Sequence, residues 1–200
     1  MTPTFLLDME QGATFNYTFH WYAGGKAMAP IEEICVGYPT RITVTAHGLP
    51  SNSDTPVILS GIITDGVDDS ILNSKDTGIE EMIWVDVDNF DVPLSTVGEV
   101  WTKGSGEITW HRPSDITDYT ARMHIREKWH SSEFIHELTT ENGGITLTVE
   151  DASIELTILP AVTEGFKFNQ AVYDIEMISP GGAITRVIEG TITLHKEVTK

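Results

Sequence analysis

QAVYDIEMISPGGAITRVIEGTITLHKEVTK, residues 170–200, is the stretch of sequence that decides the fold. Its first half alternates apolar and acidic residues, at Tyr173, Asp174, Ile175, Glu176 and Met177. This period of two predicts a half-buried strand. Ser179-Pro180-Gly181-Gly182 supplies turn residues, and an apolar return strand follows over 183–194. The adjacent pair Val187 and Ile188 breaks the alternation just before Gly190, which predicts a β-bulge or burial on both faces.

The same alternation recurs in both end segments of the chain. Aromatic residues share one parity near the N-terminus, at Phe15, Tyr17, Phe19 and Trp21. Such a stripe can form a carbohydrate platform, but the polar residues between them favour a core face. Three further runs alternate over 120–127, 145–149 and 154–158. No convincing amphipathic helix is found, and short strands separated by turns at intervals of about 8–12 residues predict an all-β sandwich or barrel.

The C-terminal run VYDIEMISPGGAITRVIEGTITLHKEVTK resembles the end of a small all-β domain common in virion proteins of tailed bacteriophages. The resemblance extends to MEQGATFNYTFHW (9–21), ITDYTARMHIREKW (116–129) and ENGGITLT (141–148). It implies a phage structural component related to the N-terminal attachment domains of upper-baseplate and fibre proteins.

The middle of the chain differs from its flanks. Residues 37–106 hold 11 Asp and Glu against 3 Lys and Arg, a net charge of −8, and are bounded by Gly37 and by Gly104 and Gly106. This composition predicts an autonomous unit inserted into another domain. The segment also resembles a small β-barrel-like domain first described in ubiquitin-activating enzymes and found as an insert in phage tail proteins. The matching residues are AHGL (46–49), VILSG (57–61), Leu72-Asn73 and the strand over 85–92. We therefore expect a discontinuous β-sandwich (1–36 and 107–200) that carries an inserted small acidic β domain (37–106).

Composition and charge argue against several classes of function. The formal net charge of −18 and the absence of a Lys/Arg run argue against a nucleic-acid binder, which needs a positive footprint. No apolar run is long enough to span a bilayer, and the N-terminal residues do not form a signal peptide, so we expect assembly in a cytoplasm. The single cysteine, Cys35, excludes an intrachain disulfide, and its neighbours Ile34 and Val36 predict that it is buried.

Motifs for catalysis or metal binding are weak. The sequence has no G-x-S-x-G elbow and no phosphate-binding glycine loop, and carboxylates placed only by the fold leave a polysaccharide hydrolase as a distant class. His124, His130 and His136 recur every six residues without an HExxH or HxH arrangement. Asp86, Asp88 and Asp91 lack the calcium-loop pattern and are expected on the solvated face of a strand, whereas the loop acids Asp65, Asp68 and Asp69 offer oxygen ligands of the kind calcium prefers. We expect no enzyme activity, no metal and no cofactor.

These observations lead to one principal expectation and two alternatives. We expect a virion structural protein, an adaptor or fibre-like component of the tail, neck or baseplate, whose partners are other virion proteins and copies of itself. The first alternative is a module that binds a host-surface glycan or receptor, for which Trp84, Trp101 and Trp110 are the candidate ligand surface. The second alternative is a capsid decoration protein.

Overall fold

A computed structural model describes residues 2–22, 25–49, 51, 56–68, 70–74 and 82–197. The chain forms two compact units: unit 1 combines Met1–Trp21 with Asp115–Lys200, and unit 2 is Tyr22–Ser114. The described residues form fifteen strands and one helix of four residues, α1 (Pro160–Thr163). The all-β class predicted from the alternating sequence is therefore confirmed. No helix in the described ranges is long and apolar enough to cross a membrane.

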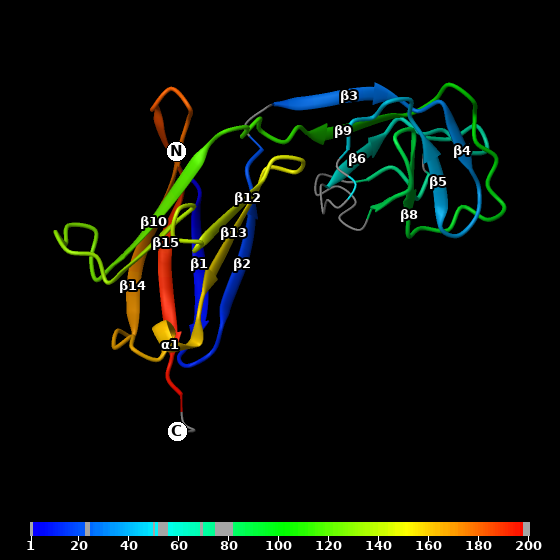
Figure 1. Ribbon diagram of the computed structural model, residues 1–200. Helices are drawn as coiled ribbons and strands as arrows, with labels where there is room; N and C mark the ends of the chain where they lie inside the picture. Colours follow the sequence, from blue (N-terminus) through cyan, green and yellow to red (C-terminus); the bar gives the residue numbers. More distant parts are fainter. Residues whose placement is uncertain are drawn as a thin grey trace. The chain divides into compact units, whose positions relative to one another are not determined.

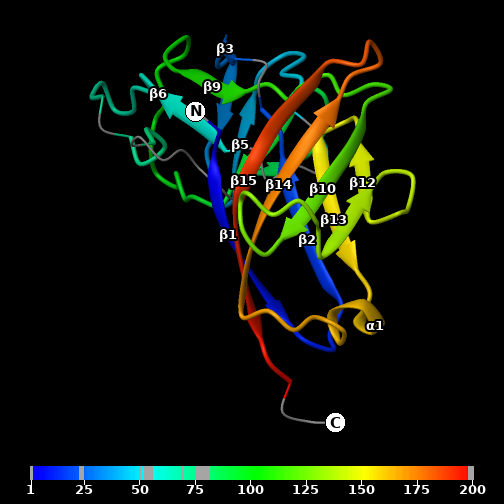
Figure 2. The same ribbon diagram turned by 90° about the vertical axis from the view of Figure 1, so that its left-hand side faces the viewer.

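Unit 1 is a sandwich of two sheets, which Figures 1 and 2 show as two layers. The strands of the larger sheet are, in spatial order, β1 (Thr4–Glu10), β15 (Ile184–His195), β14 (Gln170–Ile178), β10 (Thr120–Arg126) and β11 (His136–Thr139). The strands of the smaller sheet are β12 (Ile145–Thr148), β13 (Ser153–Ile158) and β2 (Phe15–His20). The first and last strands of the chain, β1 and β15, pair in parallel, and the other neighbours pair antiparallel.

The core of unit 1 is built from the alternating residues of both sheets. Phe15 and Phe19 are buried as the aromatic stripe predicts, with Tyr17 and Trp21 packed against them at the edge of the core. The larger sheet contributes its inward residues, among them Leu7, Met9, Met123, Ile125, Tyr173, Ile175 and Met177. Apolar burial of this kind is the main favourable term in the folding of such a sandwich.

The C-terminal hairpin forms as the sequence predicts. β14 and β15 are joined by a turn in which the Gly182 amide donates to the Ser179 carbonyl (2.8 Å), and Gly182 has a φ of +81°. The register shifts between Ile175 and Glu176, so Val187 is the extra residue of a β-bulge.

Gly190 is required by the packing of three strands. It lies between Tyr173 of β14 and Phe5 of β1, and a Cβ atom at this position would overlap the Phe5 carbonyl. The side chain of Tyr173 extends across Gly190 toward β1, and its hydroxyl donates to the Phe5 carbonyl over 3.3 Å. The Tyr173 ring is almost fully buried, and burial raises the pKa of its hydroxyl. The glycine thus allows β1 to approach the hairpin closely.

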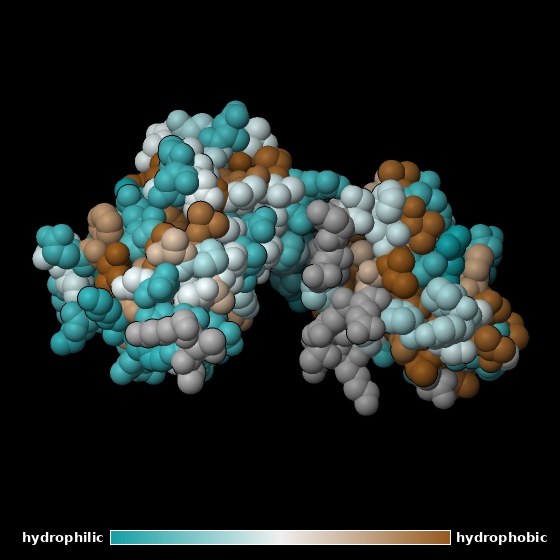
Figure 3. Space-filling view, turned by 60° about the horizontal axis from the view of Figure 1, so that its bottom comes forward, coloured by the Kyte–Doolittle hydropathy of each residue, from teal (hydrophilic) through white to brown (hydrophobic). Residues whose placement is uncertain are grey.

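Unit 2 consists of two small sheets around a second core, and in the ranges described they do not close into a barrel. The three-stranded sheet has the order β3 (Lys26–Pro30), β9 (Glu107–His111) and β6 (Val57–Ser60). The four-stranded sheet has the order β4 (Glu33–Cys35), β5 (Thr40–Thr43), β8 (Asn89–Val92) and β7 (Ile83–Trp84). Figure 3 shows separate hydrophobic areas on one face of unit 2.

The unit boundaries differ from the expected 36/37 and 106/107. Strands β3, β4 and β9 lie outside residues 37–106, yet all three belong to unit 2. β3 pairs with β9, β4 pairs with β5, and the flanking strands bury Ala27, Ile34, Ile108 and Trp110 in the second core. The excess of acid therefore marks the middle of this unit and not its first and last strands.

The expectation that Cys35 is buried is wrong. Alternation along β4 turns Ile34 into the core and leaves Cys35 exposed, opposite Arg41 of β5. An apolar neighbour on each side therefore indicated the wrong face, because neighbouring residues of a strand point to opposite sides of the sheet.

Candidate functional site

The outer face of the larger sheet of unit 1 carries a charged patch built by strand alternation. On β10 the outward residues are Arg122, His124 and Arg126, and on β14 they include Asp174 and Glu176. Because β10 and β14 are neighbours, a mainly basic row lies beside an acidic one.

Cross-strand register places opposite charges side by side. Arg122, Glu176 and Arg186 lie in one row across β10, β14 and β15. Arg122 donates to Glu176 through its Nε (2.8 Å), and its Nη2 lies 2.7 Å from the same oxygen. Arg186 is bound on its other sides by Asp174 (3.0 Å) and Glu189 (3.4 Å). Each such pair is worth little in water, but a network of half-exposed pairs fixes the direction of its side chains.

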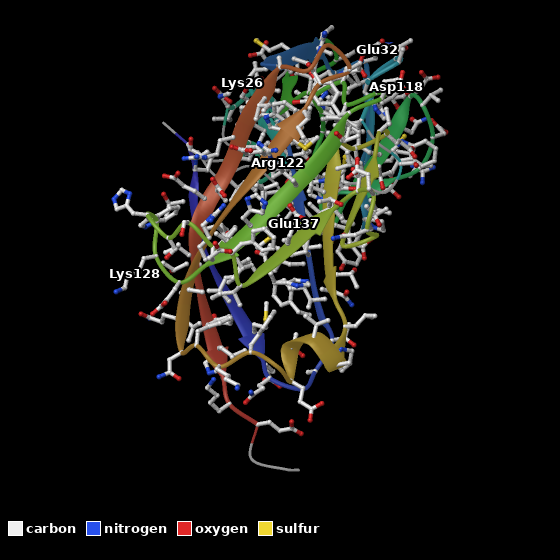
Figure 4. All side chains as sticks on the ribbon, turned by 60° about the vertical axis from the view of Figure 1, so that its left-hand side comes forward. Lys26, Glu32, Asp118, Arg122, Lys128 and Glu137 are labelled. Atoms are coloured by element: carbon white, nitrogen blue, oxygen red, sulfur yellow. The ribbon has the colours of Figure 1, made fainter. Side chains whose placement is uncertain are left out.

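The loop between β10 and β11, residues 127–135, stands over this face (Figures 1 and 2). Arg126 holds the loop by donating through one nitrogen to the carbonyls of Ser131 and Ser132, both at 2.9 Å. Phe134 stacks on His124 with their ring centres 5.1 Å apart. Figure 4 shows Arg122 and Glu137 on neighbouring strands and Lys128 on the projecting loop.

The loop and the sheet line a hollow of about 540 Å³ that is open to solvent. We call it the charged hollow; its lining is Arg122, His124, Arg126, Trp129, His130, Ser131, Ser132, Asp174, Glu176 and Arg186. The Trp129 side chain is 49% exposed beside these charged groups. An exposed indole next to guanidinium and carboxylate groups can bind by stacking and by directed hydrogen bonds. Sequence reasoning did not select Trp129, because it lies in the loop and shows no periodicity.

The three tryptophans selected from the sequence do not form this hollow. All three lie in unit 2, Trp84 on β7, Trp110 on β9 and Trp101 after β8. Trp110 is 6% exposed and is part of the second core, so its ring is not available to a ligand. Trp101 packs against the same core and donates from its indole to the Ser105 carbonyl (3.2 Å). Trp84 is half-buried opposite Phe90.

The three histidines lie in different surroundings, although His124 and His130 both line the charged hollow. The His124 Nε2 lies 2.8 Å from a carboxylate oxygen of Glu137 on β11, His130 lies in the loop, and His136 lies on β11 beside the Phe166 ring. Burial lowers the pKa of His136. In the part of the chain that the structure describes, no three His, Cys, Asp or Glu side chains are grouped to hold a metal ion.

The aspartates of residues 86–91 do not occupy a solvated strand face, so that expectation is wrong. Asp86 and Asp88 lie in the turn between β7 and β8. Asp86 accepts hydrogen bonds from the Asp88 amide and the Asn89 side chain, which lower its pKa. Asp91 is buried and binds Arg41 through both carboxylate oxygens. In the other acidic loop, Asp68 accepts from the Asn73 side chain, and Asp69 lies outside the described residues.

Comparison with known proteins gives no assignment: no family model matches the chain, and no curated protein is similar to it.

Proposed function

We propose that this protein is a structural component of a tailed-bacteriophage particle, an adaptor or fibre-like component of the tail, neck or baseplate. In this proposal unit 1 is the attachment unit that binds neighbouring virion proteins and copies of the same chain. Unit 2 is an insert that unit 1 carries. The protein is assembled into virions in the host cytoplasm and acts by binding, with neither nucleic acid nor a membrane as its partner.

The observation that carries the proposal is the charged hollow together with the exposed Trp129. Trp and Arg are enriched among the interface residues that contribute most to binding energy. A charge network that is already ordered favours a partner with the complementary arrangement of charges. The all-β architecture and the sequence resemblance to virion attachment domains support the same role.

A test is the protein content of purified particles. We expect the wild-type chain to be retained in gradient-purified particles of the phage that encodes it. The double variant Trp129→Ala, Arg186→Glu should be incorporated into particles much less. Ile184→Thr, an exposed change on the same sheet but outside the hollow, is the matched control. Absence of the wild-type chain from infectious particles would refute the proposal.

The second candidate is a module that binds a host-surface glycan, and Trp129 is the observation that favours it. A sugar ring can stack on the half-exposed indole while Asp174 and Arg186 bind its hydroxyls. Saturable binding of host surface polysaccharide that is lost in Trp129→Ala would support this candidate. A decoration protein would instead be found on the head of the particle.

A further inference from the structure

β1 presents one free edge in unit 1. It is the end strand of the larger sheet and pairs with β15 alone. The Glu189 amide donates to the Pro3 carbonyl, and the Gln11 amide donates to the His195 carbonyl. The amide and carbonyl groups of successive strand residues point alternately to the two edges of the strand. In β1 the backbone groups of the odd-numbered residues therefore point toward β15, and those of the even-numbered residues point away from it.

Three of the four outward-facing residues of β1 have backbone groups without a partner within the described residues of the chain. This applies to the amide and carbonyl groups of Thr4, Leu6 and Asp8, whereas the Glu10 carbonyl accepts from Ala13. Strands with such a row of groups readily accept another strand, and proteins usually protect them with charged side chains, Pro or a bulge. β1 contains no Pro and no bulge over its seven residues, and its only charged side chains are the acidic Asp8 and Glu10.

The side chains of β1 distinguish it from the other edge strands of unit 1. Phe5 is 44% and Leu6 56% exposed, one on each side of the sheet. The other edge strands, β2, β11 and β12, have six, four and four residues, and the apolar residues of β2 are largely buried. Phe5 already lies 5.6 Å from the rings of Tyr17 and Phe19, so an added strand would extend an existing aromatic cluster.

Charge selects the kind of strand that fits. Asp8 and Glu10 are exposed on β1, and the whole chain carries −18. A second copy would bring the same acidic charge, whereas a basic segment is attracted to this edge. We propose that β1 binds an extended segment of a partner protein, with apolar residues on the side of Phe5 and Lys or Arg beside Asp8. This rests on the proposed assembly role and deepens it by naming a surface and the chemistry of its partner.

The test uses the full chain and a synthetic ten-residue peptide of alternating valine and lysine, with a valine–glutamate peptide as control. We expect the lysine peptide to slow amide exchange at Thr4, Leu6 and Asp8, and the glutamate peptide to have no effect. Leu6→Pro removes an outward amide without breaking a bond to β15 and should weaken binding about tenfold or more. Ile184→Thr is again the control, and the melting temperature of each variant verifies folding.

A second variant keeps the test independent of proline. Asp8→Lys with Glu10→Lys should reverse the preference, so that the glutamate peptide binds and the lysine peptide does not. The inference is overturned if the peptide protects no β1 amide, if binding is equal for both peptides, or if the protein dimerises through β1. Particles that contain the chain with β1 free would overturn the inference while leaving the assembly role intact.

Discussion

At the scale of single residues, the packing of β1 against the C-terminal hairpin depends on the absence of a Cβ atom at Gly190. Gly190 leaves room for the Phe5 carbonyl of β1, and its partner on the other side is Tyr173 of β14. The requirement comes from the close approach of β1, because Gly190 does not have a positive φ.

We therefore expect Gly190→Ala to destabilise unit 1 by about 3 kcal/mol, the cost of forcing a strand out of a packed sheet. Chemical denaturation followed by tryptophan fluorescence measures the change. Gly181→Ala is the matched control, since the nearest atom to its added Cβ is 3.9 Å away and the turn remains intact. Equal stability of the two variants would show that β1 does not lie against the hairpin as described.

At the scale of elements, the Arg126 guanidinium makes two of the contacts that hold the loop over the charged hollow to the sheet. Arg126→Ala removes both bonds to the Ser131 and Ser132 carbonyls. We expect amide exchange in residues 128–132 to increase at least tenfold, with the β10 and β14 amides unchanged. Lys128→Ala, an exposed change in the same loop, should leave these rates as they are. Unchanged exchange rates in Arg126→Ala would mean that the other contacts hold the loop, namely Phe134 on His124 and the Ile135 amide on the Ile125 carbonyl.

His136 on β11 makes the stability of unit 1 depend on pH. Burial beside Phe166 lowers the pKa of His136, and the nearby Glu137 offsets this only in part. The unfolded chain therefore binds the proton more readily, so stability is lost as the pH falls through the ordinary histidine pKa of about 6.5. We expect His136→Phe to lose less stability than wild type between about pH 7.5 and about pH 5.5. Urea midpoints measure this, with His130→Gln as control, and identical slopes would contradict it.

Local periodicity predicted most strands and their buried faces. The outward basic residues of β10 and acidic residues of β14 could also be identified from their alternation. The pairing of these two strands could not, because it joins segments about fifty residues apart. The return of the 127–135 loop onto the face has no periodic signal, so Trp129 was missed. Trp110 was selected although it has the parity of Ile108 in β9, a pattern that already indicated burial.

At the scale of the whole molecule, unit 2 is an insertion whose two ends meet. Lys26 pairs with His111 in the β3–β9 ladder, and the Arg112 amide donates to the Gly25 carbonyl (3.0 Å). An insert with adjacent ends and its own core can be accommodated without disturbing the host fold.

Replacing residues 22–114 by a short Gly-Ser linker should therefore leave unit 1 folded, and residues 22–114 alone should fold as well. Dispersed amide signals in the NMR spectra of both fragments would support two autonomous units. A disordered spectrum for the chain without unit 2 would show that the sandwich depends on its insert.

The central claim, that unit 1 attaches this chain to a virion, is tested most directly by a cryo-electron microscopy map of the phage particle. We predict density for the eight-stranded sandwich of unit 1 in the tail, neck or baseplate, with a neighbouring chain against the charged hollow or the β1 edge. Particles whose tail, neck and baseplate contain no such density would contradict the claim.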